Sequence, residues 1–168
     1  MRRLLDTLYS ASAWLAGFSM IGVLVMVLAT VISRFFGFST PGTGAYAGYA
    51  MAGAGFMALA STLKHGEHIR VTLVLGMLKG KALKAMEVTA LAIATLLSGF
   101  LAFYSTRMVW QSWEIEDISV GIDATPLWIP QLLMALGTLM FFIAFCDELV
   151  LELMNKRTPR VTEGTPHE

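Results

Sequence analysis

Charged residues divide this chain into four long apolar blocks. Formal charges are absent from the segments 7–33, 35–63, 88–106 and 124–146. A helix needs about 20 predominantly apolar residues to cross about 30 Å of hydrocarbon, so each block is long enough to cross a membrane once. The pattern predicts an all-α integral membrane protein with four transmembrane helices. We expect a membrane domain over residues 1–155, with spans at about 12–34, 41–63, 86–107 and 125–147.

Two Thr-Pro pairs indicate where the second and fourth spans begin. In each pair the threonine suits an N-cap and the proline suits the first position of a helix. Thr40-Pro41 therefore predicts that the second span begins near Pro41, and Thr125-Pro126 predicts the same signal for the fourth. Pro130 then falls near the end of the first turn, where a proline costs little, or just beyond it, where it would bend the helix.

The segment between the second and third spans is too charged to cross a membrane and too apolar for a free loop. A strand here would be an isolated edge without a partner. A helix lying in the cytoplasmic interface, over about residues 66–80, explains the composition better, because its basic side chains would reach toward the headgroups. Gly80 then marks the break before a third helix that starts near Lys81.

The first block has a signal peptide as its alternative interpretation, because Arg2 and Arg3 precede an apolar run. That run is longer than the 7–15 residues typical of a signal sequence, and no small-x-small cleavage site follows before Arg34. We therefore interpret the block as a retained anchor helix.

Basic residues define the orientation. Ten of the 12 Lys and Arg residues lie at the N-terminus, between spans two and three, or in the C-terminal tail, and only Arg34 and Arg107 lie on the opposite side. The positive-inside rule therefore places both termini in the cytoplasm. Residues 156–168 are predicted to be a flexible cytoplasmic tail.

The opposite side contains an acidic loop that three tryptophans flank. Its carboxylates lie between Glu114 and Asp123, and the tryptophans are Trp110, Trp113 and Trp128. Tryptophan is enriched at membrane–water interfaces, so this arrangement fits an interfacial belt. The loop itself is either a solvated connection or a surface that docks a basic soluble partner.

Composition agrees with a membrane protein. Hydrophobic residues make up 56% of the chain and charged residues 14%, against about 25% charged residues in soluble domains. The single cysteine, Cys146, excludes an internal disulfide. The basic residues do not line one polar face, so we expect no nucleic-acid partner.

Candidate chemistry inside the spans is sparse. The four apolar blocks contain no Asp, Glu, His, Lys or Arg, whereas ion-coupled carriers usually place a carboxylate, His or Arg at membrane depth. His65 and His68 would share one helical face, but haem in a membrane bundle needs histidines on facing helices. Hydrogen bonding to headgroups or to helix-terminal carbonyls is the simpler role. We expect no cofactor and no metal, and a chain poorly equipped to transport a solute alone.

The second span is rich in small residues. Gly44 and Gly48 form a GxxxG that Ala52 continues. Such faces let helix backbones approach closely in lipid, either inside this bundle or against another chain. Arg34, directly after the first span, either reaches lipid phosphate or pairs with an acidic group of a partner subunit.

Three motifs together resemble one known family. Gly66-Glu67-His68-Ile69-Arg70-Val71 resembles the G-x-H-I-x-V signature of the small permease subunit of tripartite ATP-independent periplasmic (TRAP) transporters. Pro126-Leu127-Trp128-Ile129-Pro130 resembles the family's P-x-W-x-P stretch, and the segment around Arg34 resembles the end of its first helix. Two carboxylates common in the family are missing, one near the start of the second span and one at Thr72.

The resemblance implies a non-enzymatic scaffold subunit in a bacterial inner membrane. It would pair with a large permease subunit that carries the substrate and sodium sites, while a periplasmic binding protein delivers organic acids. Residues suggested for helix packing or for contact with the partner or with lipid are Arg34, Gly44, Gly48, Ala52, Gly66, His68, Arg70, Trp128 and Pro130. Two alternatives remain: a haem- or quinone-binding anchor of a respiratory complex, and a small exporter that works as a dimer.

Overall fold

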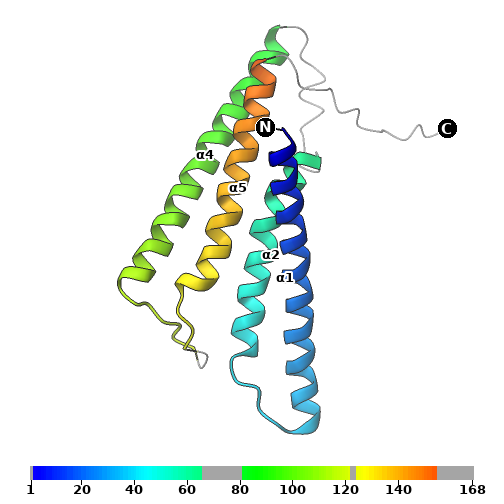
Figure 1. Cartoon of the computed structure of the whole chain (residues 1–168), viewed down its shortest axis with the longest axis vertical. Helices are drawn as coiled ribbons and strands as arrows, with labels where there is room; N and C mark the ends of the chain where they lie inside the picture. The colour runs from blue at the N-terminus through cyan, green and yellow to red at the C-terminus, as the bar shows by residue number, and fades with distance from the viewer. Residues whose placement is uncertain (1, 66–80, 122–123, 155–168) are drawn as a thin grey trace, which may run out of the picture.

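The described part of the chain is built from four α-helices. The computed structural model describes residues 2–65, 81–121 and 124–154. The helices are α1 (Arg2–Phe36), α2 (Thr43–His65), α4 (Lys81–Glu114) and α5 (Trp128–Leu153), as Figure 1 shows. Within these residues the only β-type pairing is an isolated bridge between Ile118 and Pro126. The predicted all-α class is confirmed.

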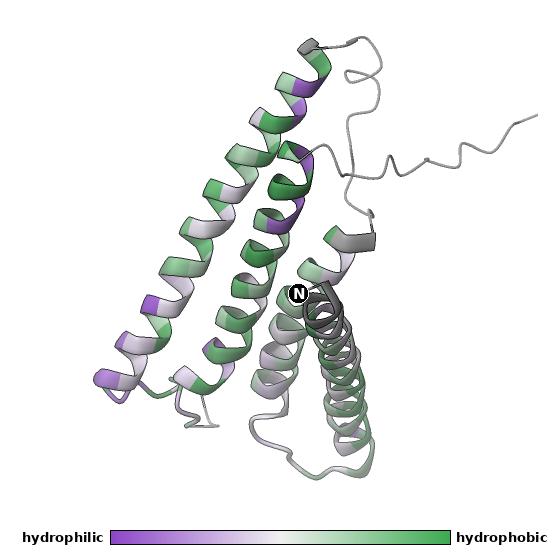
Figure 2. Cartoon of the chain, turned by 45° about the horizontal axis from the view of Figure 1, so that its top comes forward, coloured by the Kyte–Doolittle hydropathy of each residue, from purple (hydrophilic) through white to green (hydrophobic). Residues whose placement is uncertain are grey.

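Three of the four helices are long and apolar enough to cross a membrane: α1, α4 and α5. The 35 residues of α1 and the 34 of α4 extend over about 52 and 51 Å, beyond the roughly 30 Å of a hydrocarbon core. Their ends therefore reach past the core or the helices tilt within it. Figure 2 shows hydrophobic residues, in green, along the length of α4 and α5. The less hydropathic α2 is not among the three, so its span remains a prediction.

The helices stand in an open row, in the order α1, α2, α5, α4. Extensive contacts join α1 to α2, α2 to α5, and α5 to α4, whereas α1 touches α5 only marginally. In Figure 1, α2 and α5 run upward and α1 and α4 run downward, so the two central helices are parallel to each other. The chain thus consists of two antiparallel hairpins that meet where α2 packs on α5.

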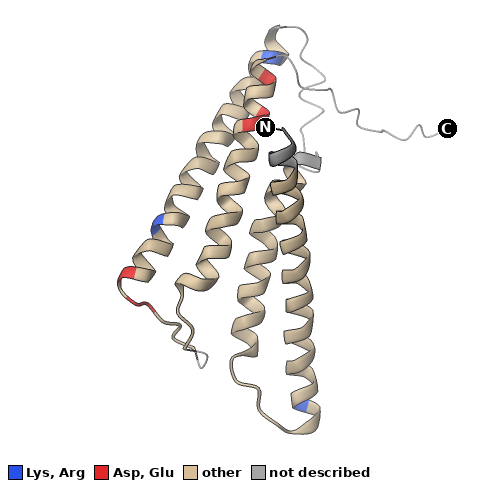
Figure 3. Cartoon of the chain, viewed as in Figure 1, with Lys and Arg blue, Asp and Glu red and all other residues tan. Residues whose placement is uncertain are grey.

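Charges lie toward the two ends of the helices. Figure 3 shows the middle of each helix free of Lys, Arg, Asp and Glu in the described residues. The last helix nevertheless differs from expectation. It continues to Leu153, and Glu148 and Glu152 in its last turns are buried, with 8% and 9% of their surface exposed. The predicted fourth span stopped at residue 147, so these two carboxylates lie beyond its predicted end.

The start of α2 corrects the first Thr-Pro signal. The helix begins at Thr43 rather than at Pro41, and its first backbone bond runs from the Tyr46 amide to the Gly42 carbonyl, 3.1 Å away. Gly42 has a φ of 84°, which glycine adopts without strain. The Thr40 hydroxyl does not cap the helix, because it donates a hydrogen bond to the Ser33 hydroxyl in the last turn of α1.

The start of α5 corrects the second signal. The helix begins at Trp128, and its N-cap, Leu127, makes no side-chain capping bond. The Thr125 carbonyl accepts a 2.8 Å bond from the Ser119 amide, so the Thr-Pro pair belongs to the loop. Pro130 lies in the first helical turn, where its missing N–H costs nothing.

The described part of α4 begins at Lys81, directly after a range that the structure does not describe, so the predicted break at Gly80 stays a prediction. The predicted interfacial segment, 66–80, and the tail, 156–168, lie outside the described residues.

Candidate partner-binding surfaces

The inner face of α2 packs against both of its neighbours in the row. A Cβ added at Gly53 would lie 3.4 Å from the Ser19 hydroxyl of α1 and 3.4 Å from the Leu133 side chain of α5. Nearer the end of the helix, Ala60 is completely buried in a cluster with Tyr9 and Ala144. Small residues on this face therefore bring three helices together.

Among the glycines that the structure describes, Gly137 of α5 makes the closest approach to a neighbouring helix, α2. A Cβ added there would lie 2.5 Å from the backbone carbonyl carbon of Phe56, a distance that real Cβ atoms essentially never show. Gly137 itself is buried. The two central helices can pack at this separation only because residue 137 has no side chain.

The outer face of α2 is a second small-residue surface, and it has no neighbour in the row. We define it by four residues that are spaced along one side of the helix: Gly44, Gly48, Ala52 and Gly55. All four are exposed, and a Cβ added at any of the three glycines would meet nothing within 4 Å. Of the two alternatives for Gly44 and Gly48, packing inside this bundle is not seen among the described residues. Contact with another chain stays open.

Outward surfaces elsewhere are bulky. α1 exposes Trp14, Phe18 and Leu24, and α4 exposes Phe100 and Phe103. Large apolar side chains of this kind suit contact with lipid tails. The outer face of α2 has only small side chains, so another helix can pack closely against it.

A network of hydroxyl groups closes the turn between α1 and α2. The Thr30 hydroxyl donates to that of Thr43 over 2.8 Å, and the Thr40 hydroxyl donates to that of Ser33 over 3.1 Å. Ser33 is buried, while Arg34 beside it is exposed. These hydrogen bonds hold the turn in place. Its surface presents the Arg34 cation and three exposed aromatic rings, those of Phe35, Phe36 and Phe38.

The loop between α4 and α5 is held by hydrogen bonds to α2. The Tyr49 hydroxyl donates to the Ser119 hydroxyl over 3.1 Å, and the Thr125 hydroxyl donates to the Tyr46 hydroxyl over 3.2 Å. A backbone bond of 2.9 Å from the Leu127 amide to the Asp117 carbonyl completes the Ile118–Pro126 bridge.

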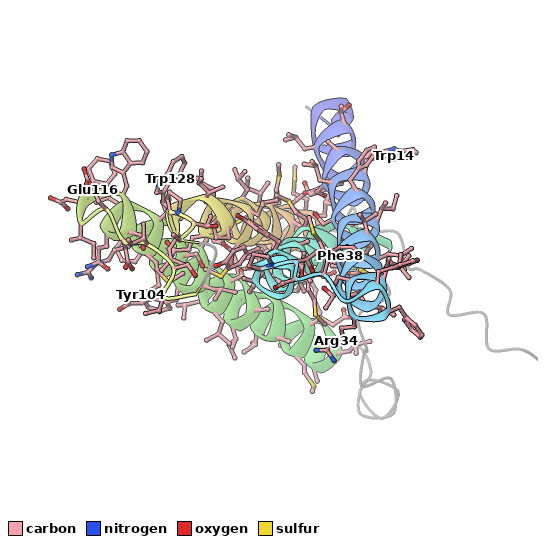
Figure 4. The ribbon with its side chains drawn as sticks, turned by 90° about the horizontal axis from the view of Figure 1, so that it is seen from below. Trp14, Arg34, Phe38, Tyr104, Glu116 and Trp128 are labelled. Atoms are coloured by element: carbon pink, nitrogen blue, oxygen red, sulfur yellow. The ribbon has the colours of Figure 1, made fainter. Side chains whose placement is uncertain are left out.

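The predicted tryptophan belt is centred on one ring pair. Trp113 at the end of α4 and Trp128 at the start of α5 meet edge to face, with ring centroids 4.8 Å apart. In Figure 4, Trp128 and Glu116 lie at one side of the molecule, and Arg34 and Phe38 lie at the other. The two turns at this end of the row are therefore separate surfaces.

The structure disperses the predicted interface residues. Arg34 lies at the end of α1, the GxxxG face lies on the outside of α2, and Trp128 and Pro130 lie in the first turn of α5. Gly66, His68 and Arg70 lie outside the described residues. Among the residues that the structure describes, no group of three or more His, Cys, Asp or Glu side chains is placed to hold a metal ion.

Sequence reasoning missed the inner face of α2, Gly137 and the buried carboxylates of α5. Gly137 is the only glycine of α5, so no GxxxG motif distinguished it. For the carboxylates a signal was available: Glu148 and Glu152 continue the four-residue spacing of Ala144 along one helical face.

A comparison with protein families gives one match. Residues 23–155 match the family described as the DctQ component of tripartite ATP-independent periplasmic transporters. No curated protein matches the chain. The matched range includes the C-terminal part of α1, from residue 23, and all of α2, α4 and α5.

Proposed function

The chain belongs to the DctQ component family of tripartite ATP-independent periplasmic transporters, and from this membership we propose that it is the small scaffold subunit of a sodium-coupled importer of organic acids. It is thus a membrane component of a transport system rather than an enzyme. The match over residues 23–155 is the observation that carries the proposal. The family match gives no support to the alternative, a haem- or quinone-binding anchor subunit of a respiratory complex.

The arrangement of the helices supports a scaffold role. A row of four helices offers two broad faces for packing, and its described residues place no Lys, Arg, Asp or Glu at mid-helix. Sodium and substrate sites would then belong to a large permease subunit, which is the expected partner. A periplasmic binding protein would deliver the solute.

We propose that α2 crosses the membrane with the other three helices. Its 23 residues extend over about 35 Å, which is enough for a hydrocarbon core. It packs between α1 and α5, which are both apolar enough to span. Lower hydropathy suits a helix that faces protein on several sides, because fewer of its side chains need to match lipid.

The distribution of basic residues supports an orientation with both termini in the cytoplasm of a bacterium and the α1–α2 and α4–α5 turns outside it. The outer face of α2 is then the natural contact for the large subunit. Its glycines lack a neighbour in the row, and close helix packing is the principal source of affinity between helices in lipid.

Co-purification and transport test the proposal. A tagged copy of this chain, expressed with the large permease subunit of the same system, should retain that subunit through detergent purification. Deletion of the chain should abolish sodium-dependent uptake of the organic acid in cells that still make the other two components. Full sodium-driven uptake by the large subunit alone would contradict the requirement for this chain.

A further inference from the structure

The turn between α4 and α5 presents aliphatic side chains to solvent beyond the tryptophan belt. Ile115, Ile118 and Val120 are exposed by 71%, 58% and 105% of their reference surface. We call these three side chains and the carboxylates of Glu114 and Glu116 the loop patch. Trp110 and Trp113 lie in the last turns of α4, and the three aliphatic residues follow them in the chain. If the tryptophans mark the interface, these aliphatic groups lie outside the hydrocarbon.

The charge of the loop patch distinguishes it from a lipid-binding surface. Its two carboxylates are exposed and carry the same sign of charge as lipid phosphate groups. Burying them in hydrocarbon would cost several kcal/mol each by general estimates, which range from about 2.5 upward. A membrane is therefore a poor occupant for this surface.

The other turn at the same end of the row has the opposite chemistry. The α1–α2 turn exposes the rings of Phe35, Phe36 and Phe38 beside the cation of Arg34. Aromatic rings and a basic side chain at a helix end suit headgroup phosphates and the interface. One turn is thus equipped for lipid, and the other carries aliphatic groups with an acidic rim.

We propose that the loop patch docks the soluble extracytoplasmic component of the transporter, through an apolar contact that basic residues of that component surround. An apolar centre with a polar rim is the usual anatomy of a protein–protein interface. The acidic rim selects a basic partner and accelerates its approach. The loop accepts a hydrogen bond from Tyr49 and donates one to Tyr46, both on α2, so it is held in place and little ordering is required on binding. The inference rests on the proposed function for its orientation.

Binding of the soluble component to the assembled transporter tests the inference. The complex of this chain with the large subunit is placed in phosphatidylcholine nanodiscs, and the purified soluble component is passed over it in a surface plasmon resonance experiment. The double variant Glu114→Lys/Glu116→Lys should bind about tenfold more weakly at low salt, with a slower association rate that depends less on salt. Val120→Ser should bind several-fold more weakly through faster dissociation.

Matched controls lie on the other turn. Ser39→Lys adds a positive charge and Phe38→Ser removes an exposed apolar group at the same end of the row. Both should bind within twofold of wild type. Equal binding by wild type and the loop-patch variants, in complexes that retain the large subunit, overturns the inference and leaves the proposed function intact. A wild-type chain that retains neither component contradicts both.

A second measurement tests the surroundings of Val120. The variant Val120→Cys, in a Cys146→Ala background, is labelled with an environment-sensitive fluorophore. Its emission should indicate water and shift to the blue when the soluble component is added. Emission that is already blue, and that brominated lipid quenches without the soluble component, would place this position in the bilayer and overturn the inference.

Discussion

The two faces of α2 are made of the same kinds of residue but have different surroundings. The inner face, with Gly53 and Ala60, is buried against α1 and α5. The outer face, with Gly44 and Gly48, is open. Composition is therefore enough to mark α2 as a packing helix, but it does not reveal which face packs within the chain. The contrast suggests that the inner face determines the fold and the outer face determines the assembly.

Gly137→Leu should have the largest effect, because it wedges the inner face of α2 away from α5. The added side chain would meet the Phe56 backbone, and overpacking of this kind costs typically 1–3 kcal/mol or more. We expect a clear fall in the thermal midpoint of the purified chain, measured by fluorescence-detected size-exclusion after heating. Gly17→Leu on α1, where a Cβ meets nothing within 4 Å, is the control. Equal midpoints for the two variants would show that the central contact does not limit stability.

Gly48→Leu tests the outer face. Its side chain enters open space in the isolated chain, so the thermal midpoint of the chain alone should be unchanged. A bulky group would instead separate a partner helix, and co-purification of the large subunit should fall about fivefold, equivalent to about 1 kcal/mol. The measurement is the ratio of the two subunits after affinity purification. Normal assembly of this variant would remove the outer face of α2 from the interface.

Tyr49→Phe should have a smaller effect, because it removes one hydrogen bond to the α4–α5 loop. Hydrogen bonds between side chains in membrane proteins average about 0.6 kcal/mol. A small fall in the thermal midpoint is expected, with assembly largely retained. Tyr104→Phe removes a hydroxyl from the exposed surface of α4 and serves as the matched control. A greater loss from the control than from Tyr49→Phe would contradict the role of this bond.

Phe18→Leu should have the smallest effect. The ring is exposed on α1, and an apolar side chain remains in its place. Changes of this kind usually alter stability by less than about 0.5 kcal/mol. Both the thermal midpoint and the yield of the complex should match wild type. A loss of assembly would mean that the bulky surface of α1, rather than the smooth face of α2, meets a partner.

Much of the helical pattern could be predicted from the sequence, because charges and apolar length act locally. The position of Pro130 in the first turn of α5 is one of the two alternatives that such local rules left open. Both Thr-Pro caps were wrong because other contacts compete for the same groups: Thr40 bonds to Ser33, and the Thr125 carbonyl bonds to Ser119.

The order of the helices in the row could not be predicted. It depends on contacts between residues far apart in the chain, such as Gly137 with Phe56 and Gly53 with Leu133. A single sequence does not pair these positions, since a lone glycine in an apolar helix has no periodic signature. The small residues Gly44, Gly48 and Ala52 were recognised from the sequence, whereas the inner face with Gly53 and Ala60 was not.

The open row has a consequence for how the chain holds together. Each helix contacts mainly its immediate neighbours, so the molecule resembles a short repeat array whose stability is a sum over adjacent pairs. The α1–α2 and α4–α5 hairpins are joined almost entirely along the α2–α5 seam. We therefore expect two fragments of the chain, divided between residues 65 and 81, to associate in the bilayer through the contact between α2 and α5.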